Sequence, residues 1–275
     1  MRGNLYLVAT PIGNLEDITF RALNVLKKVD LIAAEDTRNT LKLLNYFEIK
    51  KTLISYHRHN EEIKKDNIIE QLKEGKNIAI VSDAGTPGIS DPGEVLVREA
   101  IRENINIIPV PGACAAINAL ICSGLDTTEF LFIGFLPLNK KLRNDKIEEI
   151  KNATQTIIVY EAPHKLEKTL IDLKDILENR KVVIARELTK IHEEFIRGTV
   201  DEVIEKSCDL KGEMIILIEG REKIKQENYL NNMTIEEHYN YYAKKGLEKK
   251  EIIKKIAKDR NVSKNEIYQQ FINKK

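Results

Sequence analysis

The most informative part of this sequence is Ser82-Asp83-Ala84-Gly85-Thr86-Pro87-Gly88-Ile89-Ser90-Asp91-Pro92-Gly93. It follows the apolar run Ile78–Val81, which predicts a buried strand, and precedes a helical pattern over Glu94–Arg102. Glycine permits positive φ and close backbone approach, whereas proline fixes φ. This composition therefore predicts a rigid, shaped loop that is longer than an ordinary turn. Ligands of open α/β sheets bind beyond the carboxyl ends of the strands, so we predict a ligand-binding loop here.

Working outward from this loop, short apolar runs alternate with amphipathic helical patterns up to about Gly220. This alternation predicts α/β architecture with largely parallel sheets covered on both faces. We expect two tandem α/β domains, 1–118 and 119–222, with a ligand-binding cleft between them. The expected strands are Leu5–Ala9, Leu31–Ala34, Ile78–Val81, Ile107–Val110, Leu131–Phe135, Thr156–Tyr160, Val182–Ala185 and Met214–Ile218. One expected helix begins after Asn60 as its cap and runs to Lys73, with Gly75 as its stop.

Residues 223–275 differ from the rest of the chain in charge. They hold 13 Lys and Arg against 7 Asp and Glu, a net charge of +6, whereas the whole chain carries +1. Such asymmetry points to a nucleic-acid-facing tail, and a solvated lysine-rich surface is the alternative.

The pattern of this tail predicts a polar linker over Lys223–Asn232 and then three short helices with little core of their own. The arrangement resembles a helix-turn-helix, with a capping box of Ser263 and Glu266. The expected helices are Ile235–Lys244, Lys249–Asp259 and Ser263–Phe271, and the expected apolar face is Ile252, Ile253, Ile256 and Ala257.

Composition and motifs exclude several classes of protein. No apolar run approaches the ~20 residues of a membrane span, and the N-terminus lacks the pattern of a signal peptide. Three cysteines without C-x-x-C spacing predict neither a disulfide framework nor a zinc site, which is typical of a cytoplasmic protein without a metal. The chain also lacks the glycine fingerprints of dinucleotide-binding and P-loop proteins.

Eight short motifs, in this order, resemble those of the ribosomal small subunit methyltransferase I family, and the resemblance covers nearly the whole chain. They are Val8–Leu15, Ala34–Arg38, Ser82–Gly93, Val110–Ala113, Phe132–Pro137, Tyr160–His164, Ala185–Lys190 and Gly212–Met214. The resemblance implies the tetrapyrrole-methylase fold, a class III methyltransferase fold, with a small helical C-terminal domain. It implies methylation of a cytidine 2′-hydroxyl in the decoding region of 16S rRNA, with S-adenosylmethionine as donor and the rRNA or the small ribosomal subunit as partner. It also suggests a homodimer.

Carried onto this sequence, the motifs imply a donor pocket. Phe132 is a further candidate wall residue, for which a core position is equally plausible, and Asp91 is expected to cap a turn. The residues assigned to the pocket are Asp83, Gly85, Thr86, Pro87, Ile89, Ala115, Ala116, Phe135 and Leu136.

Charged side chains near the expected cleft are candidates for the chemistry and for RNA contacts. Glu35, Asp36 and Arg38 follow an expected strand, so that one carboxylate can act as base and Arg38 can hold a phosphate. The alternative is a capped helix start, with Asp36 as the cap and Arg38 on the surface. The residues expected to contact RNA are His57, Arg58, Lys140, Lys141 and Arg143.

Two other functions stay open at this point. The first is a small-molecule or protein methyltransferase of the same fold. The second is a non-catalytic RNA-binding factor of ribosome assembly. The lysine-rich tail and the full glycine-proline loop favour the rRNA methyltransferase over the first, and the intact loop with the Glu35, Asp36 and Arg38 cluster argues against the second.

Overall fold

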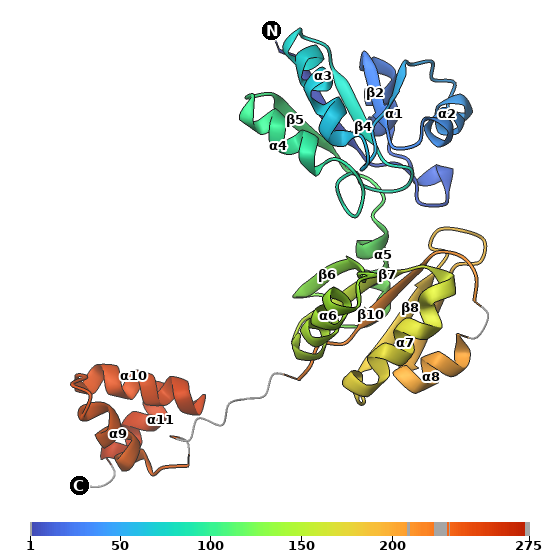
Figure 1. The fold of residues 1–275 in the computed structure, drawn as a ribbon. Helices are drawn as coiled ribbons and strands as arrows, with labels where there is room; N and C mark the ends of the chain where they lie inside the picture. The colour runs from blue at the N-terminus through green and yellow to red at the C-terminus, as the bar shows by residue number, and fades with distance from the viewer. Residues whose placement is uncertain (1, 208–209, 223–229, 231, 273–275) are drawn as a thin grey trace. The chain divides into compact units, whose positions relative to one another are not determined.

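The chain divides into two compact units, Met1–Arg221 and Glu222–Lys275, which we describe separately. The computed structural model describes residues 2–207, 210–222, 230 and 232–272. The first unit holds two β-sheets with their helices, and the second holds three helices (Figure 1). The division of the first unit into domains 1–118 and 119–222 stays a prediction.

The first sheet is parallel throughout, as the strand–helix alternation predicts, with the strand order β3-β2-β4-β1-β5. Its strands are β1 (Asn4–Val8), β2 (Leu31–Ala34), β3 (Leu53–Ser55), β4 (Ile78–Val81) and β5 (Asn106–Val110). The central strands β2 and β4 are buried along their whole length, which explains their uninterrupted apolar sequences.

Helices cover both faces of this sheet. On one face, α3 (Glu61–Lys73) and α4 (Glu94–Arg102) pack on side chains such as Leu5 and Ile80. On the other, α1 (Phe20–Lys28) and α2 (Thr37–Tyr46) pack on side chains such as Val8 and Val81. A short 3₁₀ helix, Leu15–Asp17, follows β1. Neighbouring strand residues point to opposite faces, so each strand contributes to both cores.

The second sheet is mixed, which corrects the expectation of largely parallel sheets. Its order is β6-β7-β10-β8-β9; only β6 and β7 are parallel, and the other three pairs are antiparallel. The strands are β6 (Phe130–Phe135), β7 (Thr156–Glu161), β8 (Lys181–Arg186), β9 (Glu194–Thr199) and β10 (Met214–Ile218). The strand β9 follows β8 without a helix between them, so this connection reverses the chain direction.

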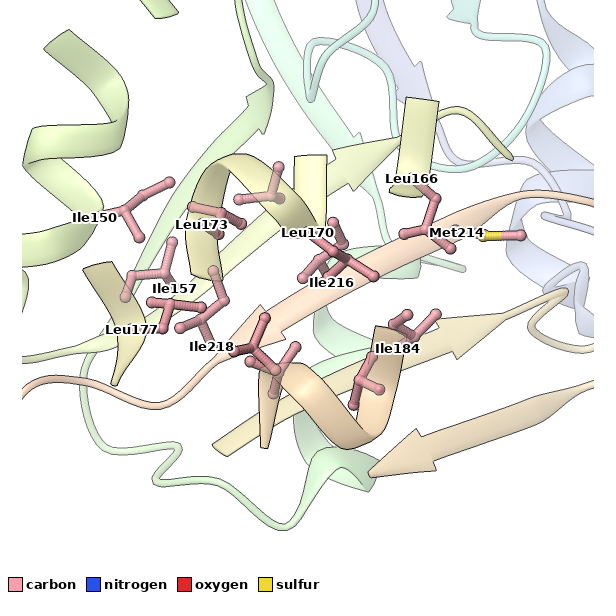
Figure 2. Close-up of a cluster of buried hydrophobic side chains, with 14 of the residues drawn as sticks. Ile150, Ile157, Leu166, Leu170, Leu173, Leu177, Ile184, Met214, Ile216 and Ile218 are labelled. Atoms are coloured by element: carbon pink, nitrogen blue, oxygen red, sulfur yellow. The ribbon is translucent and has the colours of Figure 1, made fainter. Parts of the chain in front are cut away.

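Helices also cover both faces of the second sheet. On one face lie α6 (Lys140–Asn152), α7 (Pro163–Leu177) and α8 (Val200–Lys206), and on the other lies α5 (Ala115–Ser123). Figure 2 shows the first of these cores, in which Leu170 and Leu173 of α7 lie over Ile216 of β10. Burying such side chains stabilises the fold by roughly 1.5–3 kcal/mol each.

The beginning of α3 lies where the sequence predicts, but Asn60 acts differently. The helix runs over Glu61–Lys73, and Gly75 follows it with a φ of 102°. The Asn60 side chain makes no capping hydrogen bond to the helix. Instead its Oδ1 accepts from the backbone N–H of His57 at 2.8 Å, and its Nδ2 donates to the carbonyl of Ser55 at 3.3 Å. Asn60 thus fixes the polar turn after β3.

The second unit has a small core of its own, which corrects the expectation of little core. Its helices are α9 (Ile235–Ala243), α10 (Lys249–Arg260) and α11 (Lys264–Ile272). Ser263 and Glu266 form the predicted reciprocal cap. The linker predicted over Lys223–Asn232 lies mostly outside the described residues. The hydrophobic core cluster of this unit consists of Leu230, Tyr242, Ile252, Ile253, Ile256, Ala257 and Ile267, which include the predicted apolar face.

Candidate functional site

Three loops meet where the parallel strands of the first sheet end. The loop after β1 pairs with the loop after β4: Thr10 and Gly85 donate their N–H groups to each other's carbonyl oxygens at 2.9 and 3.1 Å. The loop after β4 also reaches the loop after β5, because Thr86 Oγ1 donates to the carbonyl of Ala113 at 3.0 Å. Gly85 has a φ of 81°, a conformation that other residues adopt only with strain. The glycine-proline loop is therefore held from two sides.

A cavity of about 360 Å³ opens beside these loops, within the size range of small-molecule sites. The ends of strands in the second sheet complete its walls. The lining is mostly apolar and includes three carboxylates, but no Lys or Arg. The lining residues are Ile12, Ala84, Gly85, Thr86, Ile89, Ser90, Asp91, Cys114, Ala115, Phe135, Tyr160, Glu161, Ala162, Pro163, Ala185, Leu188, Glu213, Met214 and Ile215.

Five of the nine residues assigned to the donor pocket line this cavity, and they come from three separate segments. They are Gly85, Thr86, Ile89, Ala115 and Phe135. Ala115 is the first residue of α5, so a short side chain there leaves the cavity open next to the helix N-terminus.

The other four assigned residues lie outside the cavity lining. Pro87 is buried in the loop. Leu136 is buried in the core of the second sheet. Ala116 is buried as well, and its N–H donates to the hydroxyl of Tyr160 at 3.2 Å. Asp83 lines a neighbouring groove. Direct contact of these four residues with a donor stays a prediction, and their absence from the cavity lining argues against it.

Tyr160 is a wall residue that the sequence reasoning did not assign to the site. Its ring makes edge-to-face contacts with Phe132 and Phe135, with centroid distances of 5.1 and 5.6 Å. Burial, with a smaller effect of Cys114, raises the pKa of its hydroxyl to about 12, so the group stays protonated at neutral pH. The sequence signal that could have indicated Tyr160 is its place near the end of β7. Because β6 and β7 are parallel, this end lies beside the end of β6, which carries Phe135.

Asp91 faces the cavity and does not cap a turn, which corrects the expectation. In the part of the chain that the structure describes, its carboxylate accepts no hydrogen bond and forms no ion pair. Burial raises its pKa to about 6; the charges of Glu35 and Asp83 add to this shift, and Arg58 opposes it. The guanidinium of Arg58 donates to the carbonyl of Ser90, next to Asp91. Asp91 thus changes charge near physiological pH.

The structure brings the predicted catalytic carboxylates together at the end of β2. Asp36 caps α2 by accepting from the N–H of Arg38 at 2.8 Å, and its carboxylate also binds the guanidinium of Arg38 at 2.7 Å. These hydrogen bonds lower the pKa of Asp36 to about 2, so it is a weak base. The Arg38 side chain is 85% exposed. Asp36 and Arg38 thus form the capped helix start that was stated as the alternative. A role of these two residues in catalysis stays a prediction.

Glu35 is held more loosely than Asp36. Its Oε2 accepts from the N–H of Asp83 at 3.3 Å, the one side-chain hydrogen bond that it makes within the described ranges. Asp83 is itself fixed, because its carboxylate accepts from the N–H of Asp36 at 3.0 Å and from Nδ2 of Asn39 at 2.9 Å. Asp83 therefore organises this edge of the sheet and leaves Glu35 with free acceptor capacity.

The candidate RNA contacts on α6 differ among themselves. Lys140 and Lys141 are exposed, and no carboxylate of the described residues lies within 4 Å of either ammonium. Arg143 points inward, with Nε 2.9 Å from a carboxylate oxygen of Asp172 and Nη2 2.9 Å from the hydroxyl of Thr169. Its side chain is only 14% exposed. Arg143 is therefore poorly placed to bind a phosphate, whereas the two lysines are free to do so.

The other two candidates lie in the turn after β3. Arg58 is exposed and His57 is half-buried, and the His57 ring lies edge-to-face against His59 with a centroid distance of 5.9 Å. Arg58 reaches the loop that carries Asp91 through its hydrogen bond to the carbonyl of Ser90. An RNA contact here stays a prediction.

Comparison with known proteins assigns the class. Residues 4–204 match the family described as Tetrapyrrole (Corrin/Porphyrin) Methylases. Among solved structures, diphthine synthase gives a TM-score of 0.63 at 12% identity, covering 79% of this chain and 90% of that one. Uroporphyrin-III C-methyltransferase from Thermus thermophilus, complexed with S-adenyl homocysteine, gives a TM-score of 0.56 at 16% identity, covering 79% and 97%. The fold is therefore that of the tetrapyrrole methylases.

More similar relatives narrow the assignment. The protein named Ribosomal RNA small subunit methyltransferase I from Halalkalibacterium halodurans is 52% identical, over 97% of this chain and 94% of its own. The protein of the same name from Bacillus subtilis is 50% identical, over 98% and 94%. This chain belongs to the ribosomal RNA small subunit methyltransferase I family.

Two further features concern the described residues alone. None of their helices is long and apolar enough to cross a membrane. They contain no group of three or more His, Cys, Asp or Glu side chains arranged to hold a metal ion.

Proposed function

We propose that this protein transfers a methyl group from S-adenosylmethionine to the 2′-hydroxyl of a cytidine in the decoding region of 16S rRNA. The observation that carries the proposal is the cavity beside the loop Ala84–Asp91. The donor combines a flat adenine, an amino-acid head and a positive sulfonium. A cavity with apolar and backbone walls, three carboxylates and no cationic side chain is complementary to it. The choice of a cytidine 2′-hydroxyl follows the family resemblance.

The residues present have distinct tasks in this reaction. When bound, the donor supplies an activated methyl group. Ala115 and Gly85 leave room for the donor, and Phe135 and Tyr160 provide an apolar wall that excludes water. The carboxylate of Asp91, when ionised, would place a negative charge in the cavity that holds the positive sulfonium. Holding the reactants in line lowers the barrier by up to about 7–11 kcal/mol in well-oriented cases.

The acceptor hydroxyl must lose a proton during the transfer. Its oxygen attacks the methyl carbon; the C–O bond forms while the C–S bond breaks, and the electron pair stays on sulfur. We assign the proton to Glu35, because Asp36 is already bound by Arg38 and its pKa is about 2. A positioned base contributes typically about 10²–10⁴-fold to the rate. Asp36 and Arg38 then act by positioning the RNA backbone.

The RNA would be held by cationic groups outside the cavity. Lys140, Lys141 and Arg58 are exposed and suited to phosphates, and the tail adds a net charge of +6 over residues 223–275. The partner would be the small ribosomal subunit or its rRNA, in the cytoplasm, and the family resemblance suggests that the protein acts as a homodimer.

Deleting the gene is expected to remove one ribose methyl group from a cytidine of 16S rRNA and to leave base methyl groups in place. Mass spectrometry of nucleosides and of mapped rRNA fragments measures this directly. The control is complementation with the intact gene, which should restore the methyl group. Persistence of all ribose methyl groups would contradict the proposal. A defect in tetrapyrrole or diphthamide synthesis instead would favour a methyltransferase of the same fold with another substrate.

Deleting residues 223–275 is expected to weaken binding to the small subunit and to reduce its salt dependence. Each lost phosphate contact lowers the log–log salt slope by roughly 0.7–0.9. The measurement compares the full chain with a 1–222 variant at several salt concentrations, and donor affinity serves as the control because the cavity lies within the first unit. An unchanged slope together with a lower melting temperature would assign the tail to docking on the body.

A further inference from the structure

A second cavity lies directly against the donor cavity. It is a groove of about 510 Å³, and it shares Ile12, Ala84 and Glu213 with the first cavity. Its walls are the loop after β1, one side of α2, and Lys190 with Glu213 from the second sheet. A group bound in this groove is therefore separated from the donor cavity only by side chains that both cavities share.

One face of α2 forms a wall of this groove. Asn39, Lys42, Leu43 and Tyr46 all line it, and their spacing of three and four residues places them on one side of the helix. The packed face of the same helix carries Leu44, and Thr40, which is also buried, lies at the boundary between this face and the groove. The groove face therefore lies beside the packed face and is not needed for the core.

The side chains of Tyr46 and Lys42 on this face are exposed and are not part of the packed core. The Tyr46 residue is 64% exposed, and its ring is steadied by an edge contact with Phe47 at a centroid distance of 4.9 Å. Lys42 is exposed, and no carboxylate of the described residues lies within 4 Å of its ammonium. The other lysine of the groove, Lys190, is already paired with Glu187 at 2.9 Å and with Glu213 at 3.2 Å.

An exposed ring next to an unpaired cation is the combination that binds single-stranded RNA. Unstacked bases lie against aromatic rings, and lysine ammonium groups neutralise the neighbouring phosphates. Polar side chains such as Asn39 and Asp83 also line the groove.

We infer that this groove holds the target nucleotide, with its base stacked on Tyr46 and its flanking phosphate bound by Lys42. The inference rests on the proposed function and deepens it, because it assigns the acceptor side of the reaction to α2. Tyr46 and Lys42 are then positioning residues for the acceptor, and they do not touch the donor.

The test compares Tyr46→Ala, Tyr46→Phe and Lys42→Ala with the matched control Lys50→Ala, an exposed lysine beyond the end of α2 and outside the groove. Stacking on an aromatic ring is worth about 1–3 kcal/mol per base, so Tyr46→Ala should lower kcat/KM on undermethylated small subunits roughly 5- to 150-fold. Tyr46→Phe keeps the ring and should stay near wild type. Lys42→Ala should lower the salt slope of RNA binding by about 0.7. Affinity for S-adenosylmethionine should not change in any variant.

The outcomes separate the inference from the proposed function. If Tyr46→Ala and Lys42→Ala match Lys50→Ala while wild type methylates the subunit, the inference is overturned and the proposed function stands. If wild type transfers no methyl group, the proposed function fails. Binding of a short, fluorescent, cytidine-rich single-stranded RNA then decides the inference: weaker binding by Tyr46→Ala and Lys42→Ala than by Lys50→Ala supports it, and equal binding by all variants overturns it.

Discussion

The Ala115→Phe variant is expected to keep its fold and to lose affinity for S-adenosylmethionine by at least about 100-fold, or about 2.8 kcal/mol. Ala115 is a half-buried residue at the beginning of α5, and its side chain borders a cavity of only about 360 Å³. A phenyl ring there takes the space that the donor needs. Isothermal titration calorimetry measures the affinity, and circular dichroism checks the fold.

The matched control is Ala243→Phe, which places the same ring on an exposed position of α9 in the second unit. Its donor affinity should equal that of wild type. Normal affinity in a folded Ala115→Phe variant would show that the donor binds elsewhere.

The affinity of the wild-type protein for the donor should also depend on pH: ionised Asp91 attracts the sulfonium above pH 6, and this contribution is lost as the pH falls through about 6. Asp91→Asn should remove that dependence.

The Glu35→Gln variant is expected to lower the single-turnover rate of methyl transfer by about 10²–10⁴-fold, the usual contribution of a positioned base. Donor affinity should stay near normal, because Glu35 does not line the donor cavity. Glutamine keeps the size of the side chain and its acceptor for the N–H of Asp83, and it removes the basic oxygen. Rapid-quench experiments with labelled donor and small subunits measure the rate.

Glu70→Gln, on the exposed side of α3, is the control for the charge change and should react like wild type. Asp36→Asn and Arg38→Ala should also slow the reaction by about 10² or more through loss of positioning, and excess RNA should restore part of the Arg38→Ala rate. A Glu35→Gln rate within a few-fold of wild type would reject Glu35 as base and leave Asp91 as the carboxylate to test.

Much of the fold follows from local sequence. The bounds of β2, β4 and β10 were predicted to the residue, because each is an apolar run between polar segments and is buried along its length. The edge strands Leu53–Ser55 and Glu194–Thr199 were missed. The first is only three residues long, and the second carries charged residues that an edge position tolerates. The direction of β10, which runs antiparallel to β7 and β8, was also not predicted, since strand direction depends on contacts between distant segments.

The candidate site, too, could be predicted from local sequence only in part. The loop around Gly85 was predictable because its glycines and prolines have few other uses. Tyr160 was missed because its place in the cavity wall depends on the pairing of β7 with β6, which no local pattern shows. The inward orientation of Arg143 could not be predicted for a related reason: its partners Asp172 and Thr169 lie on another helix. Sequence patterns indicate which residue types are present, whereas a side chain's availability depends on its neighbours in space.

The environment of Asp91 has a consequence for folding thermodynamics. The pKa of this carboxyl group is about 6 in the folded protein and about 3.9 in an unfolded chain. Above pH 6 the folded state therefore holds a charge that the unfolded state solvates better, and this lowers the free energy of unfolding. As the pH falls from 6 toward 4, the folded state takes up the proton first and the loss disappears. The negative charge of Asp91 in the cavity therefore makes the folded protein less stable at neutral pH than it is with Asp91 protonated.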